Sequence, residues 1–127
     1  MRVIIDFVPH NKQRYDTVGD WFWKGQTLHI KVSRLRSWTS SFYVAIHEFF
    51  EAMWCKYWNV KQAAVDKFDM EYEKNRKEGD NSESGDDPAA PYYWGHQGGS
   101  VIEKIASLWL ENYGDKWRRY DAEVRNL

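Results

Sequence analysis

The stretch VAIHEFFEAMWCKYW, residues 44–58, has the pattern of an α-helix that is apolar nearly all round. A helix of this kind is expected at the centre of a protein core. Three ionisable side chains nevertheless occur in its middle, at His47, Glu48 and Glu51. Burying such groups is costly unless they are paired, hydrogen-bonded or bound to a metal. The sequence therefore predicts a core helix that carries a polar site.

Helical spacing groups these side chains further. Residues four apart lie on one face of a helix, so His47, Glu51 and Cys55 form one stripe. Two carboxylates beside an imidazole raise the local negative potential, which favours a bound cation. We therefore expect the stripe to bind a metal ion and to leave Glu48 free for chemistry. Cys55 could line the site, although a lone helical cysteine is more often a small buried apolar residue.

The composition indicates one folded domain. The chain has 127 residues, a formal net charge of −1 and 17% aromatic residues. Such a charge creates no overall field toward nucleic acid or a membrane, and neither is expected as a partner. Cys55 is the only cysteine, which excludes an internal disulfide framework. Because no apolar run suits a signal peptide or a membrane span, the expected location is the cytoplasm.

Residues 1–35 alternate between apolar and polar side chains, as strands do. The clearest examples are RVIIDFV, residues 2–8, and TLHIKVS, residues 27–33. A further short strand is expected near Trp21–Trp23, before a turn at Lys24–Gly25. These patterns predict a small antiparallel sheet of two or three strands.

Helical periodicity follows the predicted sheet. A helix is expected over residues 42–58, with Ser40 or Ser41 as its N-cap and a break at Asn59. An amphipathic helix over residues 60–78 comes next. The fold class is therefore α+β, with the small sheet packed on three or four helices around a central HEFFE helix.

The C-terminal part of the chain is divided by composition. Residues 79–99 form an acidic, turn-rich loop, and residues 100–124 contain the last helices, with Gly114 as the stop between them. The stretch SVIE matches a capping box, which would make Ser100 the N-cap and place Glu103 against its backbone. If one unbroken helix included both residues, Glu103 would instead share a face with His96, seven residues earlier, and become a possible fourth metal ligand.

The motif HEFFE resembles the zincin helix motif His-Glu-x-x-His, in which two histidines bind zinc and the glutamate polarises the attacking water. Transferred by position, the resemblance implies that His47 is a metal ligand and Glu48 the general base. Glu51 stands where zincins have the second histidine, and a carboxylate oxygen is an acceptable zinc ligand. His96 is the only histidine after this helix and is expected to be the third ligand.

This resemblance implies a metal-dependent hydrolase of the metallopeptidase or amidase type, acting on a peptide or another amide. The predicted metal is Zn²⁺, and a set of two histidines and one carboxylate also suits Fe²⁺ or Mn²⁺. The strand Leu28–Val32 would correspond to the zincin edge strand that aligns an extended substrate. Across its wider pattern the chain looks similar to small uncharacterised bacteriophage proteins, to which no activity is attached.

Two other functions remain open from the sequence. The acidic pairs Glu48/Glu51 and Asp66/Asp69 resemble those of the MazG-type nucleoside triphosphate pyrophosphohydrolases, which hold Mg²⁺. A non-enzymatic binding protein could use the same metal site as a structural staple. In the simplest reading, His47 and Glu51 form only a helical ion pair of a few tenths of a kcal/mol.

Two further side chains are candidate neighbours of the site. Asp69 borders the apolar stripe of the second helix and could orient a ligand histidine. Tyr92 could stabilise an oxyanion through its hydroxyl, although packing against Trp94 is the simpler expectation. His96, Asp69 and Tyr92 come from separate segments, so only the fold decides whether they meet.

Overall fold

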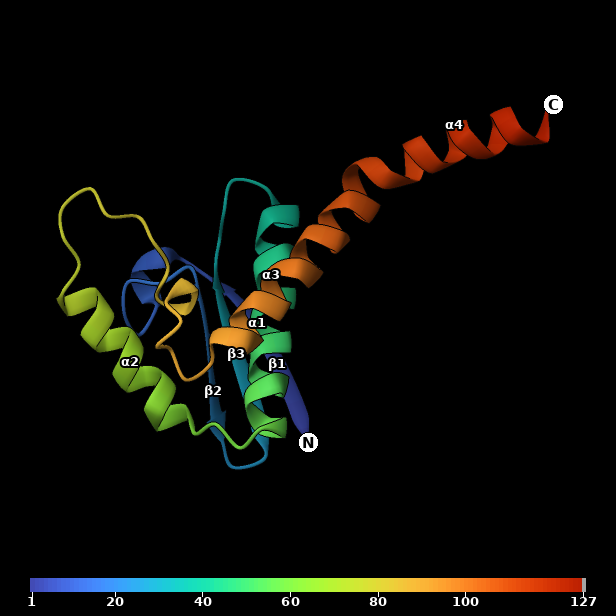
Figure 1. The fold of residues 1–127 in the computed structure, drawn as a ribbon. Helices are drawn as coiled ribbons and strands as arrows, with labels where there is room; N and C mark the ends of the chain where they lie inside the picture. The colour runs from blue at the N-terminus through green and yellow to red at the C-terminus, as the bar shows by residue number, and fades with distance from the viewer. Residues whose placement is uncertain (127) are drawn as a thin grey trace.

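The computed structural model of the protein describes the backbone of residues 1–126 and the side chains of residues 1–111, 119–120 and 122–126. A three-stranded sheet and several helices make up an α+β fold (Figure 1). The elements are β1 (Arg2–Val8), η1 (His10–Lys12), β2 (Gly19–Lys24), β3 (Thr27–Ser33), α1 (Trp38–Tyr57), α2 (Gln62–Lys74), η2 (Ser84–Asp86), α3 (Tyr93–Ser107), η3 (Leu108–Tyr113) and α4 (Gly114–Arg125).

The sheet is mixed, with the strand order β1-β3-β2. β2 and β3 form an antiparallel hairpin, whose turn at Gly25 has a positive φ of 59°. β1 pairs parallel to β3, so the prediction of a purely antiparallel sheet was wrong for this strand. Alternation shows that a strand has two different faces, but it does not show the direction of its partner. The segment Leu28–Val32 lies in the central strand rather than at an edge.

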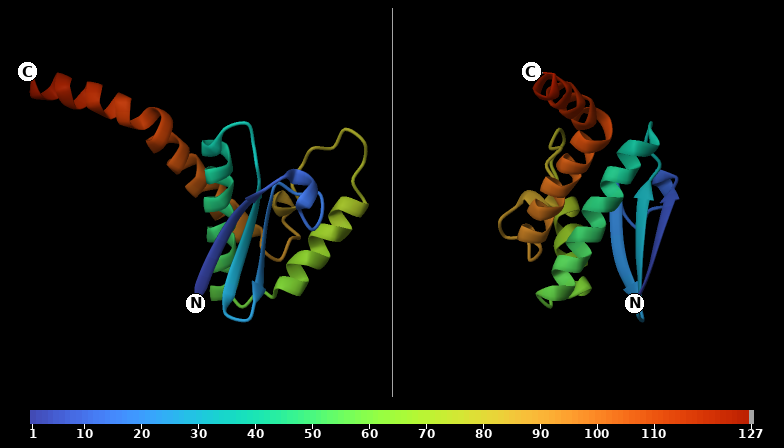
Figure 2. Two further views of the ribbon diagram at one scale, coloured as in Figure 1. Left: turned by 180° about the vertical axis from the view of Figure 1, so that it is seen from behind. Right: turned by 90° about the vertical axis from the view of Figure 1, so that its right-hand side faces the viewer.

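The helix α1 lies between the sheet and α3 (Figure 2). On the sheet side, Leu28, Ile30 and Val32 of β3 are fully buried at alternate positions. Ala45 and Ala52 of α1 belong to the same core. α1 therefore has packed neighbours on two sides, and the stripe with His47 and Glu51 is buried, whereas Phe49 and Tyr57 of the same helix are exposed.

The start of α1 differs from the prediction by a few residues. The helix begins at Trp38, and the Ser37 hydroxyl caps it by accepting from the backbone N–H of Ser40 at 3.3 Å. The predicted caps Ser40 and Ser41 lie inside the first turn, where Ser41 donates to the carbonyl of Ser33 instead. Asn59 has a φ of 56°, which confirms the predicted break.

The start of α3 overturns a larger prediction. Residues 93–99 are helical rather than part of the acidic loop, and Ser100 lies in mid-helix, so the proposed capping box is absent. Glycines suggested a loop, but their role is close packing. A Cβ at Gly95 would lie 2.9 Å from the Trp54 ring, and one at Gly99 would lie 3.0 Å from the His47 carbonyl oxygen. These glycines bring α3 close to α1.

The helix also does not stop at Gly114. The chain passes from α3 through the π-helix η3 into α4, which extends away from the rest of the fold (Figure 1). The side chain of Trp117, within the predicted C-terminal helices of residues 100–124, lies outside the described residues. Within the described chain, no helix combines the length and the apolar character needed to cross a membrane.

The Gly99 contact gives a testable prediction. Gly99→Ala is expected to push His47 out of position, since the new methyl group meets both the ring and the backbone of that residue. Overpacking of this kind costs about 1–3 kcal/mol of stability. Thermal unfolding and zinc titration measure the two effects. Lys104→Ala, at an exposed position of the same helix, is the control, and equal behaviour of the two variants would contradict this packing.

Candidate metal centre

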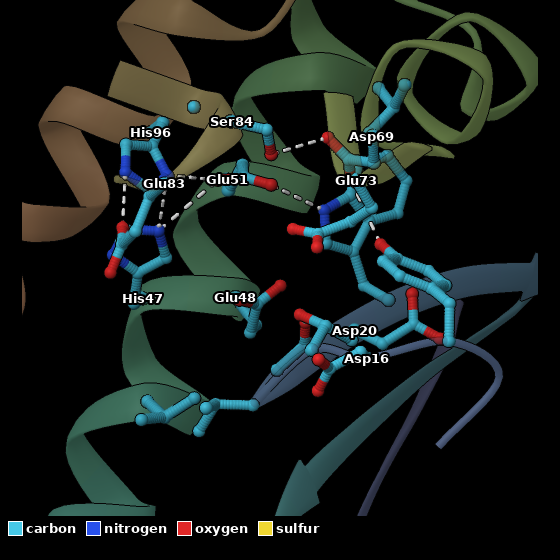
Figure 3. A pocket seen from close by; sticks show the side chains of 18 of the residues that line it. Asp16, Asp20, His47, Glu48, Glu51, Asp69, Glu73, Glu83, Ser84 and His96 are labelled. Carbon is cyan, nitrogen blue, oxygen red and sulfur yellow. Dashed lines mark hydrogen bonds and ion pairs between the residues drawn. The ribbon is translucent and has the colours of Figure 1, made fainter. Parts of the chain in front are cut away.

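Three side chains meet between α1 and α3. His47 and Glu51 are on successive turns of α1, and His96 is on the first turn of α3; all three are 5–7% exposed. His47 Nε2 lies 3.1 Å from His96 Nδ1, and each of these atoms lies 3.2 Å from Glu51 Oε2 (Figure 3). The structure therefore brings together the three metal ligands predicted from the sequence.

The spacing of these atoms suits a first-row divalent cation. The three atoms form a nearly equilateral triangle with sides of 3.1–3.2 Å. An ion about 2.1 Å from each atom would see them roughly 100° apart, between octahedral and tetrahedral angles. Two imidazoles and one carboxylate on one side of an ion leave its other positions for water or substrate. The donor set favours zinc, iron or manganese over calcium or magnesium.

Each of the predicted ligands has an outer contact that orients it. His47 Nδ1 lies 3.0 Å from Glu103 Oε1, and the Trp21 indole N–H donates to Glu51 Oε1 at 3.0 Å. Since an ionised carboxylate only accepts, the contact with Glu103 places a proton on His47 Nδ1 and turns the Nε2 lone pair toward the site. Carboxylates or other acceptors behind a ligand histidine are typical of metal centres.

The outer nitrogen of His96 faces the acidic loop. His96 Nε2 lies 2.9 Å from Glu83 Oε2 and 3.3 Å from Asp86 Oδ1. Neither oxygen lies in the direction in which an N–H bond at Nε2 would point. The contacts are therefore ion-pair contacts rather than aligned hydrogen bonds. The nearby carboxylates still favour a proton on Nε2, which leaves the Nδ1 lone pair for the inner site.

Positive charge is needed where these three atoms converge. Burial alone would lower the pKa of His47, but its hydrogen bonds to Glu103 and Glu51 raise it to about 10. Burial would also lower the pKa of His96, but the hydrogen bond to Glu51 and the contact with Glu83 raise it to about 9. Burial would raise the pKa of Glu51, but the hydrogen bonds to the two imidazoles outweigh it and lower that pKa. The site therefore holds either protons or a metal ion.

Competition between protons and metal predicts a steep pH dependence. Without metal both imidazoles are protonated at pH 7, because their pKa values of about 10 and about 9 lie above it. Binding one ion then releases about two protons, so the zinc association constant should rise roughly a hundredfold per pH unit below about pH 9. Calorimetry in buffers of different ionisation enthalpy counts the released protons. A zinc affinity that does not change with pH would contradict this scheme.

Glu48 faces the neighbouring cleft. It lies on α1, one residue after His47 and three before Glu51, and its carboxylate points toward the side of Asp20 (Figure 3). A Cβ at Gly19 would be only 2.5 Å from Glu48 Oε1, so this carboxylate rests against the backbone of β2. Burial and then the charge of Glu51 raise the pKa of Glu48 well above its ordinary value. Among the described residues, no hydrogen bond or ion pair engages it.

The cleft beside the candidate metal centre is strongly acidic. It has a volume of about 560 Å³ and is bounded by α1, α2, the start of β2 and the 80–85 segment. Ten carboxylate side chains line it, against a single arginine, Arg76, in the part of the chain described. Arg76 pairs with Glu73 at 2.6 Å, and Arg14 binds both Asp20 and Asp66. Among the described residues, Glu48 and Asp69 have no cationic partner.

The other predicted neighbours of the site have different outcomes. Glu103 contacts His47 as an outer carboxylate. Asp69 accepts hydrogen bonds from the hydroxyls of Tyr92, Tyr15 and Ser84, and burial raises its pKa to about 6. Cys55 is a buried core thiol, whose pKa burial raises to about 12. The Tyr92 hydroxyl is thus engaged by Asp69, and the residue is buried rather than stacked on Trp94.

Some members of the site were not found from the sequence. Trp21 was considered only as a strand residue, although its indole N–H binds Glu51 across thirty positions. Glu83 and Asp86 were part of an undifferentiated acidic loop. A signal was present in Gly85, since a Cβ there would lie 2.3 Å from the His96 ring. The glycine lets the loop pack directly on the imidazole.

Comparisons with protein-family models, with curated proteins and with solved structures found no match for the chain. The likeness of HEFFE to the zincin motif is therefore a likeness of a five-residue segment. What the site can do chemically follows from the geometry of the described residues.

Proposed function

We propose that this protein is a metal-dependent hydrolase, with one Zn²⁺, Fe²⁺ or Mn²⁺ ion held by His47, Glu51 and His96. The observation that carries the proposal is the convergence of three buried acceptor atoms at 3.1–3.2 Å. An ion in such a site lowers the pKa of a bound water and polarises the bond that the water attacks. The open positions of a three-ligand site are the requirement for this chemistry.

Glu48 is the general base in this proposal. It is adjacent to His47 in sequence, faces the cleft, and carries a carboxylate without a protein partner among the described contacts. Burial and the charge of Glu51 raise its pKa, which makes its carboxylate a stronger proton acceptor than that of an exposed glutamate. It would accept a proton from the water and deliver it to the leaving group.

The charge of the cleft supports a substrate with positive charge near the bond that is cleaved. Within the part of the chain that the structure describes, Glu48 and Asp69 are the lining carboxylates that lack a cationic neighbour, whereas Arg14 and Arg76 neutralise others nearby. A peptide or amide with an ammonium or guanidinium group complements this surface. Polyphosphate substrates would be repelled unless several cations accompanied them.

The geometry favours this function over nucleotide pyrophosphohydrolysis. That alternative requires Glu51 and Asp69 to be free to hold Mg²⁺. Glu51 instead contacts two imidazoles and an indole, and Asp69 is occupied by three hydroxyl donors.

The test is hydrolysis of small amides by the zinc-loaded protein. Arginine and lysine 4-nitroanilides are compared with the glutamate and leucine analogues. We expect the basic substrates to be cleaved at least about tenfold faster, as kcat/KM, since one charge-assisted contact is worth about 1.5 kcal/mol or more. Metal bound at one ion per chain without hydrolysis of any amide would leave a structural metal site and overturn the enzymatic proposal.

A further inference from the structure

The outer side of His96 has the features of a second coordination position. His96 is 7% exposed, and no described atom forms a hydrogen bond with its Nε2. Glu83 Oε2 and Asp86 Oδ1 lie close to this nitrogen, at 2.9 and 3.3 Å, but off its axis. A hydrogen-bond acceptor would lie on the axis along which the lone pair or N–H bond of Nε2 points. When a metal ion occupies that axis, its other ligand atoms lie to the side, about 3 Å from the nitrogen.

The acidic loop is held in place for this role. Gly85 packs against the His96 ring so closely that a Cβ would lie 2.3 Å from its Cγ. The residues that flank this contact, Glu83 and Asp86, thereby face the edge of the ring that carries Nε2. Their ligand atoms and that nitrogen all lie within 4.8 Å of one another. Gln97 Nε2 also donates to Asp86 Oδ1 at 3.1 Å and orients that carboxylate.

The two positions differ in access. The inner ligands His47 and Glu51 have side chains that are 7% exposed, whereas those of Glu83 and Asp86 are 67% and 56% exposed. An ion from solvent therefore reaches the outer position first. The inner position has better donors, with two imidazoles instead of one.

We propose that Glu83, Asp86 and His96 Nε2 form an outer loading site, from which a divalent transition-metal ion passes to the inner site of His47, Glu51 and His96 Nδ1. This inference rests on the inner metal centre proposed above. A neutral imidazole offers one lone pair, so a single ion occupies one position at a time. With the ion outside, the ring proton is on Nδ1 and is donated to Glu51. With the ion inside, that proton is on Nε2 and faces Glu83.

The first experiment measures the rate of Co²⁺ uptake by the full chain in stopped-flow absorption. The double variant Glu83→Gln/Asp86→Asn is expected to bind one ion per chain but at least about tenfold more slowly. The control is Glu71→Gln/Glu78→Gln, which removes the same charge from exposed positions outside the site and should keep the normal rate. Because all four side chains are at the surface, folding is not at stake. Normal uptake by the first variant would overturn the loading site.

The second experiment isolates the outer position. Glu51→Gln weakens the inner site and keeps an oxygen for the Trp21 indole. Co²⁺ should still bind this variant, at least about tenfold more weakly, and binding should disappear when Glu83→Gln and Asp86→Asn are added. No binding to Glu51→Gln, or two ions bound at once to the unmodified protein, would contradict the inference. An unmodified protein that binds no Co²⁺ would instead refute the proposed function.

Discussion

His96→Ala is expected to lower the zinc affinity of the protein by at least about a thousandfold. The substitution removes one of three ligands, and the two that remain lie on one helix without the closure that α3 provides. A zinc–imidazole bond contributes several kcal/mol, and each 1.4 kcal/mol is a factor of ten in affinity. Competition with a chromophoric chelator measures the dissociation constants of both proteins at one fixed pH.

His29→Ala is the matched control for this substitution. His29 lies on β3, on the sheet face opposite α1, where its ring stacks on Phe22 at a centroid distance of 5.2 Å. It should leave zinc binding unchanged within about threefold, since it is no member of the His47, Glu51 and His96 cluster. Equal zinc affinities for the His96→Ala and unmodified proteins would place the ion elsewhere.

Glu48→Gln is expected to produce the second large effect, which is on kcat rather than on zinc affinity. The amide cannot accept a proton from metal-bound water, so kcat should fall by about 10²–10⁴-fold. Zinc affinity should change by less than about tenfold, because Glu48 is not a ligand. Amide hydrolysis and metal content are measured on the same sample, so that loss of chemistry is separated from loss of metal.

Glu73→Gln provides a control within the same cleft. Glu73 also lines it, but its carboxylate is paired with Arg76 at 2.6 Å. The activity of the Glu73→Gln protein should remain within about threefold of that of the unmodified protein. A Glu48→Gln protein with undiminished kcat would exclude Glu48 as the base, whatever the metal does.

The inner half of the site could be predicted because it follows from helix geometry. The i, i+4 spacing of His47 and Glu51 places both on one face of any α-helix, and the apolar residues around them indicate burial. Their orientation by Trp21 could not be foreseen, since it depends on how β2 lies against α1. Helical periodicity is local information, and the pairing of distant elements is not.

His96 was expected as a ligand while its surroundings were misjudged. Three nearby glycines suggested a flexible loop, because glycine lowers helix stability by about 1 kcal/mol relative to alanine. In the structure their missing side chains let α3 approach α1, and the packing offsets that cost. The same closeness brings Glu103 to His47, where the capping-box pattern had suggested a purely local role. Tertiary packing thus overrode local propensity.

The direction of β1 illustrates a similar limit. Its alternating pattern specified a strand, but nothing in that pattern distinguishes parallel from antiparallel pairing. The β2–β3 hairpin, with its tight turn at Gly25, was evident from the sequence. The pairing of β1 with β3 joins segments that are distant in sequence, and the sequence carries no comparable signal for it.

The most direct test of the central claim is anomalous diffraction at the zinc edge from crystals grown with one equivalent of Zn²⁺ at about pH 8. We expect a single strong peak within about 2.3 Å of His47 Nε2, His96 Nδ1 and Glu51 Oε2. Stoichiometric zinc bound away from these three atoms, or no peak in crystals of protein that remains folded, would contradict it.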